Sequence, residues 1–287
     1  MFEQSKATPV IIFSDLDGTL LDHYTYKSTE ALPIIAQLNS AQVPIVLTTS
    51  KTLAEVISIQ KNLNIKAPLI IENGAAVLFP KNMFAQQPKD TTEKGDYWVK
   101  SFCSSQDHWL SIIEKAPADF KGLFQGFSTL SLEELVKITG LSADDAKLAK
   151  HRQYGEPIHW LGNEQKKSEF IQYLEKSGAT VLHGGRFFHV SGESDKGKAL
   201  NWLTQSYKDM FTIDKILTIA LGDGKNDIAM LEAANIAVQI RSPVHNFPSL
   251  NKQDNLIQTE KYGPAGWAES LEKLLPNPLP IAAFSTN

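Results

Sequence analysis

Short apolar runs alternate with segments of helical periodicity along the first third of the chain. Three runs rich in aliphatic residues, 10–13, 43–47 and 69–71, have the length of buried strands, and each ends in polar residues. Between them, the apolar positions of residues 29–40 and 53–63 recur at the spacing of one helix face. Strands alternating with helices predict parallel pairing through crossover helices, hence an α/β fold with a doubly wound, mostly parallel sheet.

This alternation stops near residue 80. Residues 81–95 are polar and predict a connector. In the following region, up to about residue 189, Ser131 and Ser142 each precede a helical pattern, and residues 187–190 have the composition of a strand. Because the parallel rhythm is lost here, the region predicts an inserted α+β domain.

The alternating pattern returns after residue 191. It predicts helices over 196–207 and 227–234 and strands over 216–220 and 236–238. From residue 276 the chain is rich in proline and predicts an irregular tail. The second half of the α/β sheet is therefore expected from this part of the chain.

Composition narrows the possible partners. The 287 residues are 42% hydrophobic and 21% charged, which is typical of a globular protein, and the net charge of -4 gives no general attraction to nucleic acid or anionic membranes. No apolar stretch approaches the roughly 20 residues of a membrane span. One cysteine, Cys103, excludes an intrachain disulfide. We expect a cytoplasmic protein with a small-molecule partner, and the sequence leaves its oligomeric state open.

Three polar clusters follow predicted strands directly. They are Asp-Leu-Asp-Gly-Thr at 15–19, Thr-Ser-Lys at 49–51 and Gly-Asp-Gly-Lys-Asn-Asp at 222–227. Ligands of open α/β sheets bind outside the carboxyl ends of the strands. The three clusters are therefore expected to meet at one edge of the sheet.

The acidic residues of these clusters predict a metal site. Asp15 and Asp17 are close enough in the chain to repel each other unless a cation lies between them. Asp223 supplies a further oxygen from the other strand end. A set of carboxylates without sulfur or a dense histidine cluster indicates Mg²⁺, which would pair with a phosphate.

The same clusters offer a nucleophile for phosphoryl transfer. The sequence has no Gly-x-Ser-x-Gly elbow, and a carboxylate can itself attack phosphorus. Asp15 is predicted to be this nucleophile, with Asp17 as general acid and base. Thr49 would donate a hydrogen bond to the phosphoryl oxygens, and Lys196 would add a fixed positive charge.

Each cluster alone also has an ordinary structural interpretation. Residues 15–19 and 222–227 have the composition of turns and loops, and residues 49–51 that of a helix N-cap. Lys196 alone would be read as a solvated lysine. Their occurrence together, in order and each at a strand end, favours the active-site interpretation.

The pattern resembles the haloacid dehalogenase-like phosphatase superfamily. Its four motifs match Asp15/Asp17, Thr49, Lys196 and Asp223/Asn226/Asp227. The resemblance implies that Asp15, the backbone carbonyl of Asp17 and Asp223 bind Mg²⁺, with Asp227 supporting the site. It further implies a catalytic core of residues 1–85 and 190–287 and a substrate-specificity cap of residues 86–189.

Within this superfamily the chain is similar to the mannosyl-3-phosphoglycerate phosphatase family. Ser-Lys-Thr at 50–52 is characteristic of that family, and residues 71–74, 152–157, 184–189 and 263–267 resemble its local signatures. The resemblance implies hydrolysis of mannosyl-3-phosphoglycerate to mannosylglycerate. The residues expected around the substrate are Ser50, Lys51, Asn73, Arg186, Asn226 and Asp227.

Alternatives remain at the level of the sequence. Arg186 either binds the substrate carboxylate or packs over Phe187 or Phe188. A broader sugar-phosphate phosphatase or a phosphomutase would share the same core, and a noncatalytic binding protein could retain the fold. The sequence does not distinguish a mannosyl from a glucosyl substrate.

Overall fold

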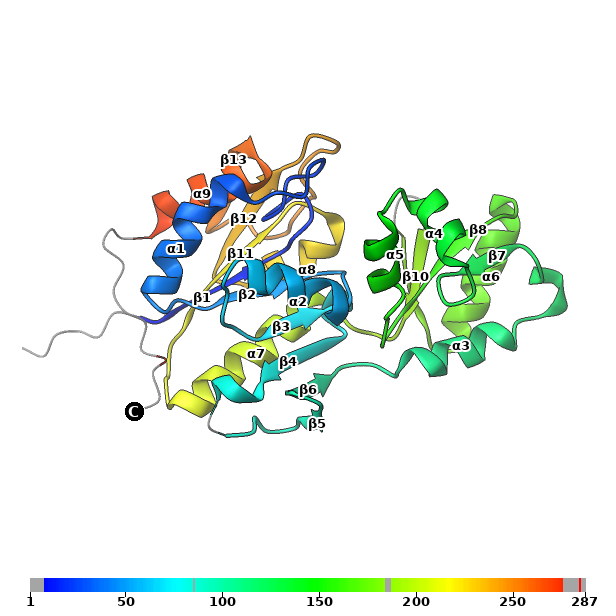
Figure 1. Cartoon of the computed structure of the whole chain (residues 1–287), viewed down its shortest axis with the longest axis horizontal. Coiled ribbons are helices and arrows are strands. Elements are labelled where there is room, and N and C mark those ends of the chain that lie inside the picture. The colour runs from blue at the N-terminus through cyan, green and yellow to red at the C-terminus, as the bar shows by residue number, and fades with distance from the viewer. Residues whose placement is uncertain (1–7, 85, 184–186, 276–283, 285–287) are drawn as a thin grey trace, which may run out of the picture. The chain divides into compact units, whose positions relative to one another are not determined.

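The computed structural model of the chain describes residues 8–84, 86–183, 187–275 and 284 (Figure 1). These residues divide into two compact units. Unit 1 groups the described residues of segments 1–50, 59–100 and 195–287, and unit 2 those of segments 51–58 and 101–194. In the part of the chain that the structure describes, no helix has both the length and the hydropathy needed to cross a membrane.

Unit 1 is built on a nine-stranded sheet. Its strands, in spatial order, are β13 (Leu256–Tyr262), β12 (Ile236–Arg241), β11 (Leu217–Gly222), β1 (Val10–Ser14), β2 (Ile45–Thr48), β3 (Leu69–Ile71), β4 (Ala76–Pro80), β6 (Tyr97–Ser101) and β5 (Thr92–Lys94). The strands from β13 to β3 pair in parallel, whereas β4 runs antiparallel to β3 and β5 runs antiparallel to β6. The predicted α/β class with a mostly parallel sheet is confirmed.

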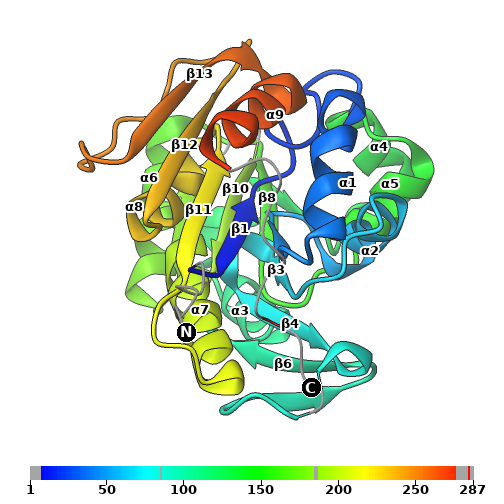
Figure 2. The same ribbon diagram turned by 90° about the vertical axis from the view of Figure 1, so that its left-hand side faces the viewer.

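Helices cover both faces of this sheet, which explains why its central strands are continuously apolar. The α-helices outside unit 2 are α1 (Leu32–Ser40), α7 (Lys196–Phe211), α8 (Ile228–Ala233) and α9 (Gly263–Leu274), while α2 (Leu53–Asn62) has residues in both units. Helix α9 contacts β12, β13 and α1, and α8 contacts β11, β12 and α7 from the other side of the sheet (Figure 2). Ile11, Ile12 and Phe13 of β1 are fully buried between these layers.

Several elements were not predicted from the sequence. Strand β5 lies inside the predicted polar connector 81–95, together with a 3-10 turn at Lys81–Met83, so the expectation of a simple connector was wrong. All three β5 residues are exposed, and β13 at the opposite edge is mostly exposed as well. Edge strands of this kind need no apolar run, and for this reason they leave no hydrophobic signal in the sequence. The predicted irregular tail from residue 276 lies almost entirely outside the described residues.

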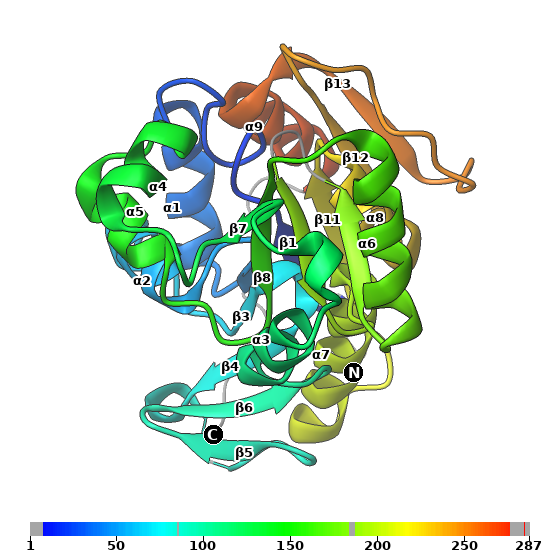
Figure 3. The same cartoon turned by 90° about the vertical axis from the view of Figure 1, so that its right-hand side faces the viewer.

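Unit 2 contains a separate antiparallel sheet in the order β7 (Phe124–Gly126), β8 (Glu156–Trp160), β10 (Phe187–Ser191) and β9 (Thr180–His183). Helices α3 (Gln106–Glu114) and α6 (Glu164–Lys176) cover one face of this sheet (Figure 3). Their Trp109, Phe170 and Leu174 form a core with Ile158 and Phe188 of the sheet. This unit has the α+β character expected of the insertion.

Two further helices of unit 2 begin where the sequence predicts. The Ser131 hydroxyl accepts a hydrogen bond from the N–H of Glu134 at the start of α4 (Leu132–Thr139), and the N–H of Ser131 donates to the carboxylate of Glu134. Ser142 caps α5 (Ala143–Ala149) through the N–H of Asp145. A serine N-cap satisfies one of the backbone donors that a helix leaves unpaired at its first turn.

Candidate active site

Three neighbouring strands of unit 1 end at the same edge of the sheet. Ser14, the last residue of β1, is paired with β2 on one side and with β11 on the other. Asp15, Thr49 and Asp223 are the residues that follow these three strands. The N–H of Asp15 continues the ladder by donating to the carbonyl of Leu221 at 2.9 Å. The predicted convergence of the three polar clusters is therefore present.

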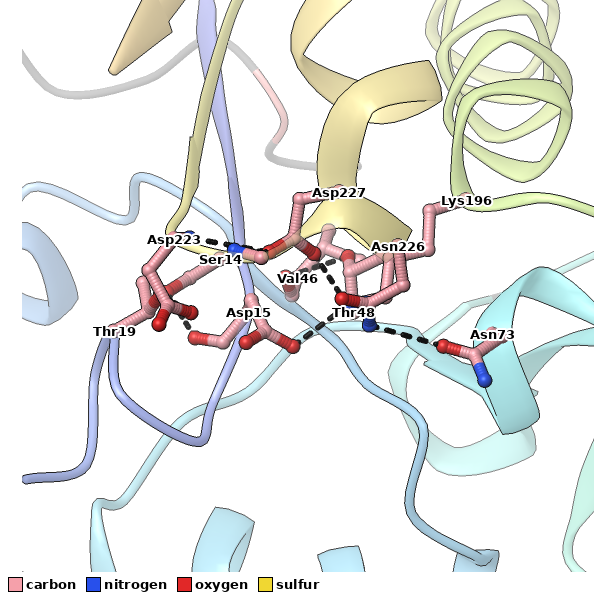
Figure 4. Close-up of polar contacts among 11 residues, drawn as sticks. Ser14, Asp15, Thr19, Val46, Thr48, Asn73, Lys196, Asp223, Asn226 and Asp227 are labelled. Atoms are coloured by element: carbon pink, nitrogen blue, oxygen red, sulfur yellow. Dashed lines mark hydrogen bonds and ion pairs between the residues drawn. The ribbon is translucent and has the colours of Figure 1, made fainter. Parts of the chain in front are cut away.

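Lys196 joins two of these clusters (Figure 4). Its Nζ donates to Oδ1 of Asp15 and to Oδ1 of Asp227, at 2.6 Å each, and the side chain is fully buried. Burial lowers the pKa of Lys196, but the carboxylates of Asp15 and Asp227 raise it more, so the pKa lies above its ordinary value. Lys196 is consequently a permanent cation at neutral pH rather than a solvated surface lysine.

The position of Lys196 depends on the first turn of α7. Asp195 caps this helix by accepting a hydrogen bond from the N–H of Lys198 at 2.7 Å. The backbone of Gly74 lies directly against this turn, and a Cβ at Gly74 would be 2.2 Å from the carbonyl oxygen of Asp195. Gly74 also has a positive φ of 87°. Glycine is therefore required here both by the close contact and by the backbone conformation. This close contact holds the helix terminus beside the strand ends.

Asp227 organises the loop that follows β11. Its Oδ2 accepts hydrogen bonds from the N–H groups of Asp223 and Gly224, at 3.1 and 2.9 Å. A Cβ on Gly222 would lie 2.6 Å from Asp227. With Lys196 on Oδ1, both oxygens of Asp227 are engaged, which fits a supporting rather than a ligating role.

Asp15, Asp223 and Asp227 form a cluster that fits a metal ion. One carboxylate oxygen from each of the three lies within 4.8 Å of the others, and all three residues are buried. Both oxygens of Asp227 accept hydrogen bonds from Lys196 and from the loop N–H groups. Asp15 and Asp223 are therefore the side chains best suited to ligate a cation. Hard oxygen ligands of this kind suit Mg²⁺. The assignment of Asp17 to the metal through its backbone carbonyl remains a prediction.

The electrostatics of the cluster also favour a cation. Burial and then the charge of Asp227 raise the pKa of Asp223 to about 6, and the same two causes raise the pKa of Asp15 despite the opposing effect of Lys196. A raised carboxyl pKa means that the negative form is destabilised by its surroundings. A divalent cation between Asp15 and Asp223 would offset the repulsion among these buried carboxylates.

Cation binding by the full chain is therefore expected to depend on pH. Because every ligating carboxylate must be deprotonated and the pKa values of both Asp15 and Asp223 are raised, affinity should fall by at least about tenfold per pH unit once the pH drops below the Asp223 pKa of about 6. Calorimetric titration with Mg²⁺ or Mn²⁺ at a series of pH values measures this dependence.

Thr19 provides a matched variant for this test. Its hydroxyl donates to Oδ1 of Asp223 at 3.3 Å and lowers the pKa of that carboxyl. In the isosteric Thr19→Val chain, the loss of affinity should begin at a higher pH. An affinity that stays unchanged down to about pH 5 would contradict the prediction.

The Thr-Ser-Lys cluster does not form the N-cap of the following helix. Thr52 has that role, since its N–H and hydroxyl exchange hydrogen bonds with Glu55 at 2.8 and 3.2 Å. Thr49 is fully buried directly after β2, and Ser50 is partly buried beside it. Lys51 groups with unit 2. The capping interpretation of residues 49–51 was therefore wrong, and the substrate roles of Ser50 and Lys51 remain predictions.

Two of the expected substrate residues contact each other. Asn226 donates through Nδ2 to Oδ1 of Asn73 at 3.2 Å (Figure 4). Asn73 has a left-handed backbone with a φ of 59°, a conformation that asparagine tolerates better than most residues. This bond links the loops after β3 and β11 at the rim of the site. Arg186, the residue expected to bind the carboxylate, lies outside the described residues.

The structure adds contacts to Asp223 that the sequence analysis did not predict. Besides Thr19 on Oδ1, Nε2 of His245 lies 3.3 Å from Oδ2. Thr19 belongs to the polar cluster at residues 15–19, but His245 comes from a loop after β12 that carries no recognisable motif. Trp267 and Tyr154 are buried, and they are hydrogen-bonded to Ser14 and Ser101, so both serve as core residues.

Comparison with known proteins agrees with this geometry. A family model for haloacid dehalogenase-like hydrolases matches residues 12–247. A protein of Methanococcoides burtonii named glucosyl-3-phosphoglycerate/mannosyl-3-phosphoglycerate phosphatase is 36% identical over 92% of this chain and 97% of its own length. A protein of the same name from Persephonella marina is 35% identical over 93% of this chain and 97% of its own length.

Solved structures show the same architecture. A phosphatase of the haloalkanoate dehalogenase superfamily from Bacteroides thetaiotaomicron superposes with a TM-score of 0.64, covering 95% of this chain and 97% of that protein at 16% identity. At this identity the likeness concerns the fold alone. It includes both the mostly parallel sheet and the separate antiparallel one.

Proposed function

Because this chain belongs to the haloacid dehalogenase-like hydrolases, we propose that it is a phosphatase that hydrolyses a glycosyl-3-phosphoglycerate to the glycosylglycerate and inorganic phosphate. The substrate class follows from the two relatives described above, whose similarity extends over nearly the whole chain. We further propose the mannosyl compound as the preferred substrate.

The geometry of Asp15 carries the proposal. Among the residues that the structure describes, Lys196 is the side chain that bonds to its carboxylate, and it does so through Oδ1. Oδ2 is therefore available to attack a phosphorus atom placed at the carboxyl edge of the sheet. Asp15 follows a rigid central strand, so its carboxylate is held in place before the substrate arrives.

A divalent cation fits the donor set of this site. Asp15 and Asp223 would hold it with their carboxylates and Asp17 with its backbone carbonyl. Magnesium bound there would neutralise phosphate charge and orient the phosphoryl group for in-line attack.

The two chemical steps use residues of the same loop. Asp15 Oδ2 forms a bond to phosphorus while the bond from phosphorus to the glycerate oxygen breaks, and Asp17 protonates the leaving oxygen. Asp17 then removes a proton from a water molecule that attacks the aspartyl-phosphate. The phosphorus–Asp15 bond breaks, phosphate leaves, and Asp15 is a carboxylate again.

The other polar residues stabilise charge during these steps. Lys196 opposes the protonation of Asp15 and holds its carboxylate in position, and the hydroxyl of Thr49 would donate to a phosphoryl oxygen. Asn73 and Asn226, linked at the rim, would orient the part of the substrate that leaves. Asp227 acts through Lys196 and through the loop amides that it binds.

A substrate panel tests the proposed function. With Mg²⁺, the full chain should release phosphate from mannosyl-3-phosphoglycerate and glucosyl-3-phosphoglycerate with a kcat/KM at least about 100-fold above that for simple sugar phosphates. Comparable efficiencies across the panel would indicate a generalist phosphatase instead. Transfer of phosphate to a second sugar without release would indicate a mutase.

A further inference from the structure

The peptide groups on the two sides of Asp15 are held in different ways. On the amino side, the N–H of Asp15 donates to the carbonyl of Leu221 and continues the ladder between β1 and β11. A parallel ladder would go on with a bond from the N–H of Asp223 to the carbonyl of Asp15. Here the N–H of Asp223 donates to Oδ2 of Asp227 instead, at 3.1 Å. Because buried carbonyls are almost always paired, the carbonyl of Asp15 needs another donor.

Ser14 supplies this donor. Its hydroxyl donates to the carbonyl of Asp15 at 2.7 Å, and Nε1 of Trp267 donates to the same hydroxyl oxygen at 3.0 Å. Both Ser14 and Trp267 are fully buried. The direction of the two bonds is fixed, because an indole N–H can only donate and a carbonyl oxygen can only accept. A directed chain of hydrogen bonds therefore runs from Trp267 to the peptide that joins Asp15 to Leu16.

Helix α9, which carries Trp267, is packed closely at its first turn. A Cβ on Gly263 would lie 3.6 Å from Cα of Asp22, in the loop that follows β1. A Cβ on Gly266 would lie 2.4 Å from the carbonyl oxygen of Lys261, so the helix lies directly against β13. Because these contacts join backbone to backbone, they fix the position of the helix. The indole of Trp267 is consequently presented to Ser14 from a rigid support.

We propose that Ser14 and Trp267 form a positioning pair for the nucleophile, which fixes the peptide after Asp15 and thereby the direction of its carboxylate. The proposal rests on the proposed function in one respect, the role of Asp15 as the nucleophile. Neither residue of the pair touches substrate. Together with the bond from Lys196 to Oδ1, the pair restrains Asp15 before the substrate arrives. The same peptide also starts the turn that leads to Asp17.

Two substitutions remove the two bonds separately. Ser14→Ala removes the hydroxyl and leaves the carbonyl of Asp15 without this donor. Trp267→Phe keeps an aromatic ring in the core but removes the indole N–H that orients the hydroxyl. Ser206→Ala is the matched control, since Ser206 is also a buried serine whose hydroxyl donates to a backbone carbonyl, that of Trp202 in α7.

The first turnover of mannosyl-3-phosphoglycerate with Mg²⁺, followed by rapid quench on chains shown to be folded by circular dichroism, tests the pair. A displaced nucleophile slows attack on phosphorus without weakening substrate binding. Ser14→Ala should lower the maximal first-turnover rate by about 10- to 100-fold, and Trp267→Phe by about 3- to 10-fold. The substrate concentration for half of that rate should change by less than about threefold. Ser206→Ala should match the unchanged chain.

A double variant shows whether Trp267 acts through Ser14. The chain with both substitutions should be no slower than Ser14→Ala alone, because the bond from the indole has already lost its acceptor. A purely structural role would lower the stability of the variants and leave the rate of the folded chains unchanged. A folded Ser14→Ala chain with a rate within about twofold of the unchanged chain would overturn the proposal. Losses that multiply in the double variant would overturn the connection between Trp267 and Ser14.

Beryllium trifluoride gives a readout that does not depend on the identity of the substrate. With Mg²⁺ it binds a carboxylate oxygen in place of a phosphoryl group, and fluorine NMR follows its binding to the full chain. Ser14→Ala should bind it at least about tenfold more weakly than the unchanged chain, and equal binding would overturn the proposal. If the unchanged chain released no phosphate but this difference was present, the proposed substrate would be wrong and the positioning pair supported. If the unchanged chain did not bind beryllium trifluoride at all, the nucleophile and the positioning pair would both be overturned.

Discussion

Replacing Asp15 with asparagine is expected to reduce phosphate release by on the order of 10⁴-fold or more, because an amide cannot form the covalent bond to phosphorus. The change is isosteric, and Lys196 keeps its ion pair with Asp227 at 2.6 Å, so the chain should still fold. Steady-state phosphate release at saturating Mg²⁺ measures the effect, and circular dichroism checks the fold.

Asp195→Asn is the matched control for this experiment. It makes the same chemical change one residue before Lys196, and asparagine retains the oxygen that caps α7. This variant should keep most of the activity. If a folded Asp15→Asn chain, shown to contain no deamidated protein, retained more than a few per cent of the rate, Asp15 would not be the nucleophile.

Replacing Lys196 with methionine is expected to lower the free energy of unfolding at neutral pH by about 3 to 5 kcal/mol. The substitution keeps most of the side-chain volume but leaves the carboxylates of Asp15 and Asp227 buried without their shared cation. Because the pKa of Lys196 in the folded chain lies above its ordinary value of 10.5, its stabilisation is complete at neutral pH. The stabilisation is lost only as the pH rises through that raised pKa.

Urea denaturation of the metal-free chains measures this loss. The difference between the variant and the unchanged chain should narrow as the pH is lowered, because burial and the charge of Asp227 raise the pKa of Asp15, and protonation of this buried carboxyl removes its repulsion with Asp227. Lys198→Met, at an exposed position on the same helix, should change stability little. A double substitution of Lys196→Met with Asp227→Asn should cost less than the sum of the two single changes, because the residues are in contact.

Much of the core of unit 1 was predictable from hydrophobic pattern. Strands β1, β2, β3 and β11 are apolar over nearly their whole length because helices bury both faces of a parallel sheet, and such runs stand out in a sequence. The carboxyl ends of these strands also fixed the meeting point of the polar clusters. For that reason the sequence alone predicts that Asp15, Thr49 and Asp223 lie together.

Elements at the periphery were not predictable in this way. Strands β5 and β13 are largely exposed edge strands, and β4 reverses the parallel rhythm by pairing antiparallel to β3. Their positions depend on pairing with strands that are already in place. The boundaries proposed for the catalytic core and the cap remain predictions.

The sequence by itself determined which residue types gather at the edge of the sheet, because the apolar strands and the polar residues that follow them are local features of the chain. Only the tertiary structure decided the partners of those residues. The double ion pair of Lys196 and the contact of His245 with Asp223 join residues far apart in the chain. Such contacts depend on how loops pack in three dimensions, and no periodicity in the sequence records them.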